Sequence, residues 1–165
     1  WTGMADSVRD EAQRSFIASR EGTPLYAYAT DGAGRFHFYH DANDVPLALA
    51  PAWGFVSADD PVWRATVEFA FSPANEGGCY ARRLGSIHTP APWPLGDIQE
   101  LIIAQTLGDH GRARRAEARL VAAAQWDGAL PEATAADSIR VVSRHWFAWP
   151  NALLACVKRG VLARD

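Results

Sequence analysis

Apolar and polar residues recur at helical spacing along most of the chain. In residues 4–19, Met4, Val8, Ala12 and Phe16 form one apolar stripe, while Arg and Asp residues occupy the other faces, as in an amphipathic helix. Capping residues, prolines near first turns and further apolar stripes predict five more helices. We expect these helices at residues 44–51, 61–71, 94–109, 111–126 and 146–160.

Between the first two predicted helices, residues 25–39 (LYAYATDGAGRFHFY) alternate apolar and polar positions around the Gly-rich segment 31–34. This pattern predicts a short β-hairpin. The segments 73–93 and 127–140 are rich in Gly, Pro and small residues and are predicted to be long loops, the first with room for short strands. The expected fold is therefore a mainly all-α single domain over residues 1–165, with one hairpin.

Composition narrows the function classes. The 165 residues carry a net charge of −3, which argues against a nucleic-acid or membrane partner. The two Cys are far apart and the five His are scattered, so we expect no disulfide framework, metal site or cofactor. Neither a signal peptide nor a run long enough to span a membrane is present, which predicts a cytoplasmic protein.

Four stretches, all at predicted loop-to-helix junctions, are unusually polar or aromatic. Each has a structural explanation by itself, as a helix cap, a buried His, a surface carboxylate or a counter-ion. Alternate junctions of an antiparallel helical assembly lie at the same end, however, and carboxylates, an amide, an imidazole, a guanidinium and Trp side chains together are typical of a sugar site. The candidate residues are Asp41, Asn43, Ser86, His88, Thr89, Trp93, Glu132, Arg144 and Trp146.

The last of these stretches, SRHWFAWPN (residues 143–151), contains a proline that limits where its helix can begin. Pro150 is unfavourable inside a helix, so the helix is expected to start near residues 147–149. Arg144 and Trp146 would then lie on the entering loop, within reach of a ligand. We expect Phe147 and Trp149 to pack inward against the core.

The order of these motifs resembles glycoside hydrolase family 125, the metal-independent exo-α-mannosidases. The resemblance runs from about residue 25 to residue 160 through YAYATDGAGRFHFYHDANDVPLAL, DDPVWRATVEFAFS, GSIHTPAPWPLGDIQELI, LPEAT and SRHWFAWPNALL. It implies a partial (α/α)6 toroid of antiparallel helix pairs and inverting hydrolysis of a terminal α-linked (1,6) mannose on a glycan, without a metal or other cofactor. It implies that Glu132 is the general base and that the other candidates line the sugar pocket.

The chain also departs from the family pattern. It has HDAN where the family has DDAN, SIHT where the family has SPHT, and Pro131 before the predicted base. No segment upstream of the hairpin matches the one that carries the family's general acid. The resemblance therefore covers the C-terminal portion of the catalytic domain, and we expect self-association or a missing N-terminal half, because a cut toroid exposes apolar edges. Two alternatives stay open: an (α/α)6 glycosidase acting on α-glucosides, glucoamylase-like or trehalase-like, and a non-catalytic carbohydrate-binding or structural helical module.

Overall fold

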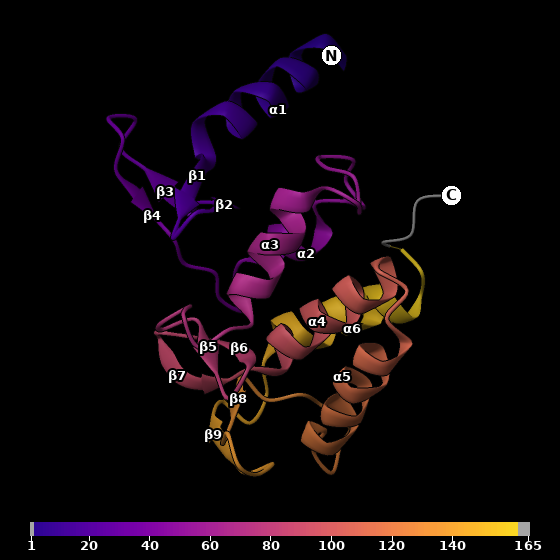
Figure 1. Cartoon of the computed structure of the whole chain (residues 1–165). Coiled ribbons are helices and arrows are strands. Elements are labelled where there is room, and N and C mark those ends of the chain that lie inside the picture. The colour runs from indigo at the N-terminus through magenta and orange to yellow at the C-terminus, as the bar shows by residue number, and fades with distance from the viewer. Residues whose placement is uncertain (1, 162–165) are drawn as a thin grey trace.

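The computed structural model describes residues 2–161, which form six helices and nine short strands (Figure 1). Each of the six predicted helices is present, with its ends shifted by up to three residues. The helices are α1 (Thr2–Phe16), α2 (Val45–Leu49), α3 (Pro61–Ala70), α4 (Pro94–Thr106), α5 (His110–Ala123) and α6 (Ala148–Lys158). The strands are β1 (Ile17–Arg20), β2 (Thr23–Tyr26), β3 (Ala29–Thr30), β4 (Phe36–His37), β5 (Cys79–Tyr80), β6 (Arg83–Ser86), β7 (Thr89–Pro92), β8 (Ala133–Thr134) and β9 (Val141–Ser143).

The predicted hairpin is present but shorter than expected. Strands β3 and β4 pair antiparallel across the turn that contains Gly32 and Gly34. Both glycines have positive φ, 70° and 94°, a conformation that favours Gly. Residues 25–26, expected in this hairpin, instead belong to β2 and pair with β1. The first helix consequently ends at Phe16, three residues before its predicted end.

Short strands occupy part of the segment 73–93, which was expected to be a long loop with room for such strands. Strands β5, β6 and β7 form a three-stranded antiparallel sheet with a register shift between Gly85 and Ser86. A Cβ at Gly85 would lie 1.8 Å from the carbonyl oxygen of Ala91, so this position accepts only Gly. The close approach lets β6 and β7 pack tightly and fixes the direction of the turn between them.

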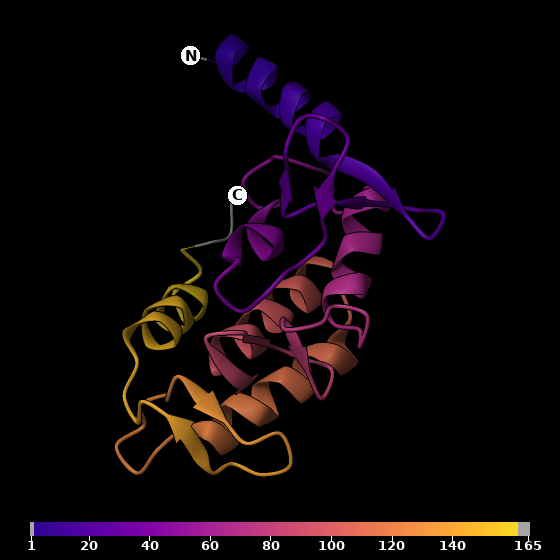
Figure 2. The same ribbon diagram turned by 90° about the vertical axis from the view of Figure 1, so that its left-hand side faces the viewer.

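Helix α4 is the centre of the core. Every residue from Pro94 to Ala104 is buried, and α2, α5, α6 and β6 all pack against this helix. The antiparallel pair α4–α5 and helix α6 lie together at one end of the molecule with β5–β9, while α1 and the hairpins β1–β2 and β3–β4 lie at the other (Figures 1 and 2). A helix that is covered on all sides is a firm base for the loops that begin and end near it.

Two of the buried residues on α4 are carboxylates, and arginines from neighbouring elements compensate their charge. Asp97 is fully buried and accepts hydrogen bonds from Arg83 Nε (3.0 Å) and Nη2 (2.6 Å) and from Arg119 Nε (2.7 Å). Glu100 binds Arg112 Nε at 3.0 Å and also pairs with Arg119. The network joins β6, α4 and α5, and this pairing is what makes two buried carboxylates tolerable.

Candidate functional site

The loop between β4 and α2 carries the first two candidate residues, and three elements anchor it. Ala42 is fully buried; its N–H donates to the carbonyl of Gly85 on β6 (2.7 Å), and its carbonyl accepts from Gln99 Nε2 on α4 (2.6 Å). The carbonyl oxygen of His40, just upstream of Asp41, accepts a hydrogen bond from Asn75 Nδ2 (2.6 Å). Asn75 Nδ2 also donates to the carbonyl oxygen of Ala70 (2.8 Å). These bonds fix the backbone on both sides of Asp41.

Asp41 is the centre of a polar cluster at this loop. Its side chain is almost fully buried; Oδ1 accepts from Asn43 N (2.8 Å), and Oδ2 accepts from Tyr39 Oη (2.9 Å) and Asn43 Nδ2 (3.1 Å). Asn43 Nδ2 also donates to Ser86 Oγ on β6 (3.2 Å). Burial of Tyr39, together with its hydrogen bond to Asp41, raises the pKa of that phenol to about 12, because both disfavour the phenolate.

Glu132 is the centre of a second polar cluster, immediately before β8. It is 2% exposed. Its Oε2 accepts hydrogen bonds from Ser143 Oγ (2.5 Å) and Thr89 Oγ1 (3.3 Å), and its Oε1 pairs with the Arg144 guanidinium. The Glu132 N–H donates to the carbonyl of Arg144 (2.9 Å), which sits at the strained φ of 41°. A buried carboxylate is thus held in one orientation beside an opposite charge.

The turn between β6 and β7 connects the two clusters. Ser86 at its start binds Asn43, and Thr89 at its end binds Glu132. The backbone N–H of His88 donates to Ser86 Oγ (3.3 Å), which fixes the turn itself. Six sequence-predicted residues, Asp41, Asn43, Ser86, Thr89, Glu132 and Arg144, are therefore joined by hydrogen bonds that meet at this turn.

A pocket of about 620 Å³ opens beside the Asp41 cluster, within the size range of small-molecule sites. Asp41, Asn43 and His88, three of the candidate residues, line it. It is also lined by Tyr28, His37, Tyr39, Glu76, Ile87 and Trp149. Of these six, none was among the predicted site residues, although Tyr39 precedes Asp41 by only two positions and Trp149 lies in the stretch SRHWFAWPN.

The three tryptophans near the site lie differently from what the sequence indicates. Trp149 was expected to pack inward, and this prediction is wrong: it is 55% exposed and lines the pocket. Trp93 was a candidate pocket residue but is 2% exposed; its Nε1 donates to the carbonyl of Thr89 (3.0 Å) and its ring packs edge-on against Phe147. Trp146 is 69% exposed and is not among the residues that line the pocket. Trp93 therefore belongs to the core, where it packs against Phe147, and it does not line the pocket.

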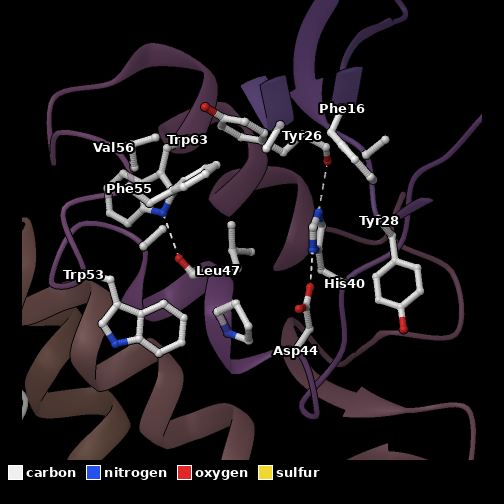
Figure 3. Close-up of a pocket in the computed structure, with 14 residues that line it drawn as sticks. Phe16, Tyr26, Tyr28, His40, Asp44, Leu47, Trp53, Phe55, Val56 and Trp63 are labelled. Carbon is white, nitrogen blue, oxygen red and sulfur yellow. Dashed lines mark hydrogen bonds and ion pairs between the residues drawn. The ribbon is translucent and has the colours of Figure 1, made fainter. Parts of the chain in front are cut away.

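A second pocket, of about 370 Å³, lies between α1, α2 and the start of α3 (Figure 3). Its walls are mostly apolar, and Phe16, Trp53 and Trp63 are among them. Its main polar feature is His40, whose Nδ1 lies 2.7 Å from Asp44 Oδ2 and whose Nε2 lies 3.2 Å from the carbonyl oxygen of Tyr26. None of the predicted site residues lines this pocket.

Between residues 2 and 161 no group of three His, Cys, Asp or Glu side chains is placed to hold a metal ion. In the same range, none of the helices combines the length and hydrophobicity that crossing a bilayer requires.

Comparison with known proteins shows what the chain is similar to. The model of the family "Metal-independent alpha-mannosidase (GH125)" matches residues 2–157. The meiotically up-regulated gene 157 protein of Schizosaccharomyces pombe is 31% identical over 139 residues, 79% of this chain and 26% of that protein.

Among solved structures, a Streptococcus pneumoniae protein superposes with a TM-score of 0.78 at 29% identity, over 95% of this chain and 38% of its own. It is described as a metal-independent alpha mannosidase in a non-productive substrate complex with α-1,6-mannobiose. The chain thus spans about a quarter of the curated relative and well under half of the solved one.

Proposed function

The chain belongs to the GH125 family of metal-independent α-mannosidases, and on that premise we propose that the protein containing it removes terminal α-linked mannose from a glycan. The observation that carries the proposal is the environment of Glu132. A carboxylate that is 2% exposed, oriented by two hydroxyl groups and compensated by a guanidinium, is what a positioned general base requires.

The proposed reaction inverts the configuration at the anomeric carbon. Glu132 takes a proton from a water molecule while the oxygen of that water forms a bond to the anomeric carbon. The glycosidic carbon–oxygen bond breaks on the opposite face, and a carboxylic acid protonates the departing oxygen. We expect this general acid to lie in a part of the protein other than residues 1–165. Residues 1–165 alone should then bind sugar without hydrolysing it.

Recognition of the terminal sugar is assigned to the polar wall of the pocket. Asp41 and Asn43 offer a carboxylate and an amide at fixed positions, and His88 adds an imidazole on the turn. These groups bind hydroxyls, because carboxylate oxygens accept their protons and amide and imidazole N–H groups donate to their oxygens. Ser86, Thr89 and Arg144 hold Asn43 and Glu132 in place, and Trp93 supports the turn from the core side.

A 1,6 linkage is the proposed specificity, supported by the α-1,6-mannobiose bound in the Streptococcus pneumoniae relative. This chain departs from the family pattern DDAN at this point, because His40 rather than Asp precedes Asp41. The His40 ring pairs with Asp44. Asp44 begins helix α2 without a side-chain capping bond. Its carboxylate instead pairs with the His40 ring, and both side chains line the apolar pocket.

The proposal is tested with the full-length protein on aryl α-mannosides, aryl α-glucosides and α-1,6-mannobiose. The expected result is release of mannose, with β-mannose as the first anomer in the NMR spectrum of the product. Turnover of α-glucosides only would favour the glucoamylase-like alternative. Saturable sugar binding without turnover of any substrate would favour a carbohydrate-binding module, and a first product with the α configuration would contradict inversion.

A further inference from the structure

The imidazole of His40 lies between two acceptor oxygens that belong to different parts of the fold (Figure 3). Its Nδ1 is 2.7 Å from Asp44 Oδ2, at the start of α2, and its Nε2 is 3.2 Å from the carbonyl oxygen of Tyr26 on β2. The ring of Phe69 on α3 packs nearly at right angles to it, with the centroids 6.2 Å apart. Because His40 is 4% exposed, these two oxygens, rather than bulk water, decide where the ring carries its protons.

Two acceptors favour a ring that carries a proton on both nitrogens. A neutral imidazole has one N–H donor and one bare nitrogen, so one of the two contacts would bring a lone pair against a lone pair. An imidazolium donates to both oxygens, and the Asp44 carboxylate compensates its charge. Asp44 is the residue before α2, where an Asp side chain usually caps the helix, yet it makes no such bond. Its carboxylate is committed to the His40 ring instead.

The His40–Asp44 pair spans the segment that carries two of the sugar-site candidates. Asp41 and Asn43 lie between the paired residues, and the N–H of Asp44 donates to the carbonyl of Asp41 (3.0 Å). The N–H of His40 donates to Asn75 Oδ1 (3.2 Å), and its carbonyl accepts from Asn75 Nδ2 (2.6 Å). Both the backbone and the ring of His40 are therefore held. A change at the pair reaches Asp41 through this short, hydrogen-bonded stretch of backbone.

We propose that His40 is an imidazolium and that its ion pair with Asp44 positions the segment 41–43 for the terminal sugar. Loss of one ring proton then weakens sugar binding. The role is one of positioning, because the His40 ring lines the apolar pocket and not the pocket beside Asp41. An Asp in place of His40, as in the family pattern DDAN, has no N–H for the Tyr26 carbonyl and would repel Asp44. The link to the sugar rests on the proposed function, whereas the charge on the ring does not.

Other ionisable groups around the pair come from several elements. They are Tyr26 on β2, Tyr28 and Tyr39 beside the hairpin β3–β4, Asp41, and Arg20 on β1, whose guanidinium lies 4.5 Å from the centroid of the Phe69 ring. Burial raises the pKa of Tyr26 and raises that of Tyr39 to about 12. Neither phenol therefore changes its charge between about pH 6 and about pH 9. His37 and His88 line the pocket beside Asp41, and comparing variants that keep both removes their contribution.

The charge on His40 is measured by NMR of the ring nitrogens in the full-length protein with isotopically labelled histidine. The spectrum of His40→Gln identifies the His40 signals. At neutral pH we expect a proton on both ring nitrogens, with the similar shifts that an imidazolium gives. In Asp44→Asn, which removes the counter-charge but keeps the shape of the side chain, the ring should carry one proton at the same pH. A wild-type ring with one protonated and one bare nitrogen would overturn the proposal.

The positioning role is measured as the affinity for mannose, which has no glycosidic bond to hydrolyse, by calorimetric titration of the full-length protein between about pH 6 and about pH 9. Asp44→Asn should bind mannose about three- to tenfold more weakly than wild type near the lower pH, the equivalent of one hydrogen bond inside a protein. This difference should shrink as the pH rises, because high pH removes the second ring proton of the wild type. His110→Gln, at the exposed start of α5, is the matched control and should follow the wild type.

The outcomes separate this inference from the proposed function. If the wild type does not bind mannose, the proposed function and the positioning role are both overturned, and the NMR signals still decide the charge on His40. If mannose binds but Asp44→Asn differs from wild type by the same factor at every pH, or not at all, the positioning role of the charged pair is overturned and the proposed function stands. A lower Tm of Asp44→Asn with no pH-dependent difference in affinity would likewise leave the pair a structural role only.

Discussion

The buried charge network around α4 allows a stability prediction whose size follows from the structure. Asp97→Ala removes a carboxylate that is fully buried and accepts three hydrogen bonds from Arg83 and Arg119. Among residues 2–161, Arg83, whose side chain is 13% exposed, would keep no ion-pair partner, whereas Arg119 would still pair with Glu100. Removing one partner of a buried pair costs about 3–5 kcal/mol, and most of that cost should arise at Arg83.

The assay is urea unfolding of residues 1–165 followed by circular dichroism, with thermal melts in parallel. The expected loss corresponds to a fall in Tm of roughly 6–20 °C for a chain of this size. The double variant Arg83→Met/Asp97→Leu buries no unpaired charge. Its loss in free energy of unfolding should therefore be at least about 1 kcal/mol smaller than the summed losses of the single variants Arg83→Met and Asp97→Leu. A free energy of unfolding for Asp97→Ala within about 1 kcal/mol of wild type would refute this account of the network.

Three further predictions concern the sheet, the pocket and the state of association. Gly85→Ala should destabilise the chain in urea unfolding by about 2 kcal/mol or more, because its Cβ would meet the Ala91 carbonyl at 1.8 Å; unchanged stability would contradict the tight β6–β7 contact. Tyr39, with its pKa raised to about 12 from an ordinary 10.0, holds its proton more tightly in the folded state. Stability should therefore fall as pH rises from about 10 to about 12, and a tyrosinate absorbance transition near pH 12 should be missing in Tyr39→Phe. Met4 and Val8, each 63% exposed on α1, predict self-association of residues 1–165 in sedimentation experiments, and a monomer at all concentrations would contradict this.

Helix positions were predictable from the sequence wherever a local rule decides them. Asp60 before Pro61 predicted the start of α3, and the Asp60 carboxylate accepts from Trp63 N at 2.7 Å as a capping residue does. Pro150 predicted that α6 begins near residue 148, and it does. In each case the residues that fix the helix end lie within one turn of it.

The short strands were not predictable in the same way. The hairpin β1–β2 depends on a turn in which Glu21 and Gly22 both have positive φ, 52° and 85°, and Glu does not favour that conformation. Strands β5 to β7 are two to four residues long, too short for an alternating pattern. Their pairing depends on contacts with α4, which a local pattern does not contain.

The sequence indicated which residues belong to the candidate site better than it indicated how their side chains are directed. The motifs identified Asp41, Ser86, Thr89 and Glu132, which the structure links through one turn. They did not indicate that Trp149 faces the pocket, because the direction of a side chain in a first helical turn depends on how the helix is docked. Phe147 takes the inward position against Trp93, and Trp149 is left outside.

Glu132→Gln in the full-length protein tests the proposed role of Glu132 as the general base of a mannosidase. Glu117→Gln on α5 is the matched control, since Glu117 lies away from the described pockets. Glu132→Gln should lower kcat on α-1,6-mannobiose by at least about a hundredfold, with sugar affinity and Tm close to those of the control. A Glu132→Gln protein that folds normally and keeps the kcat of the control would contradict the claim.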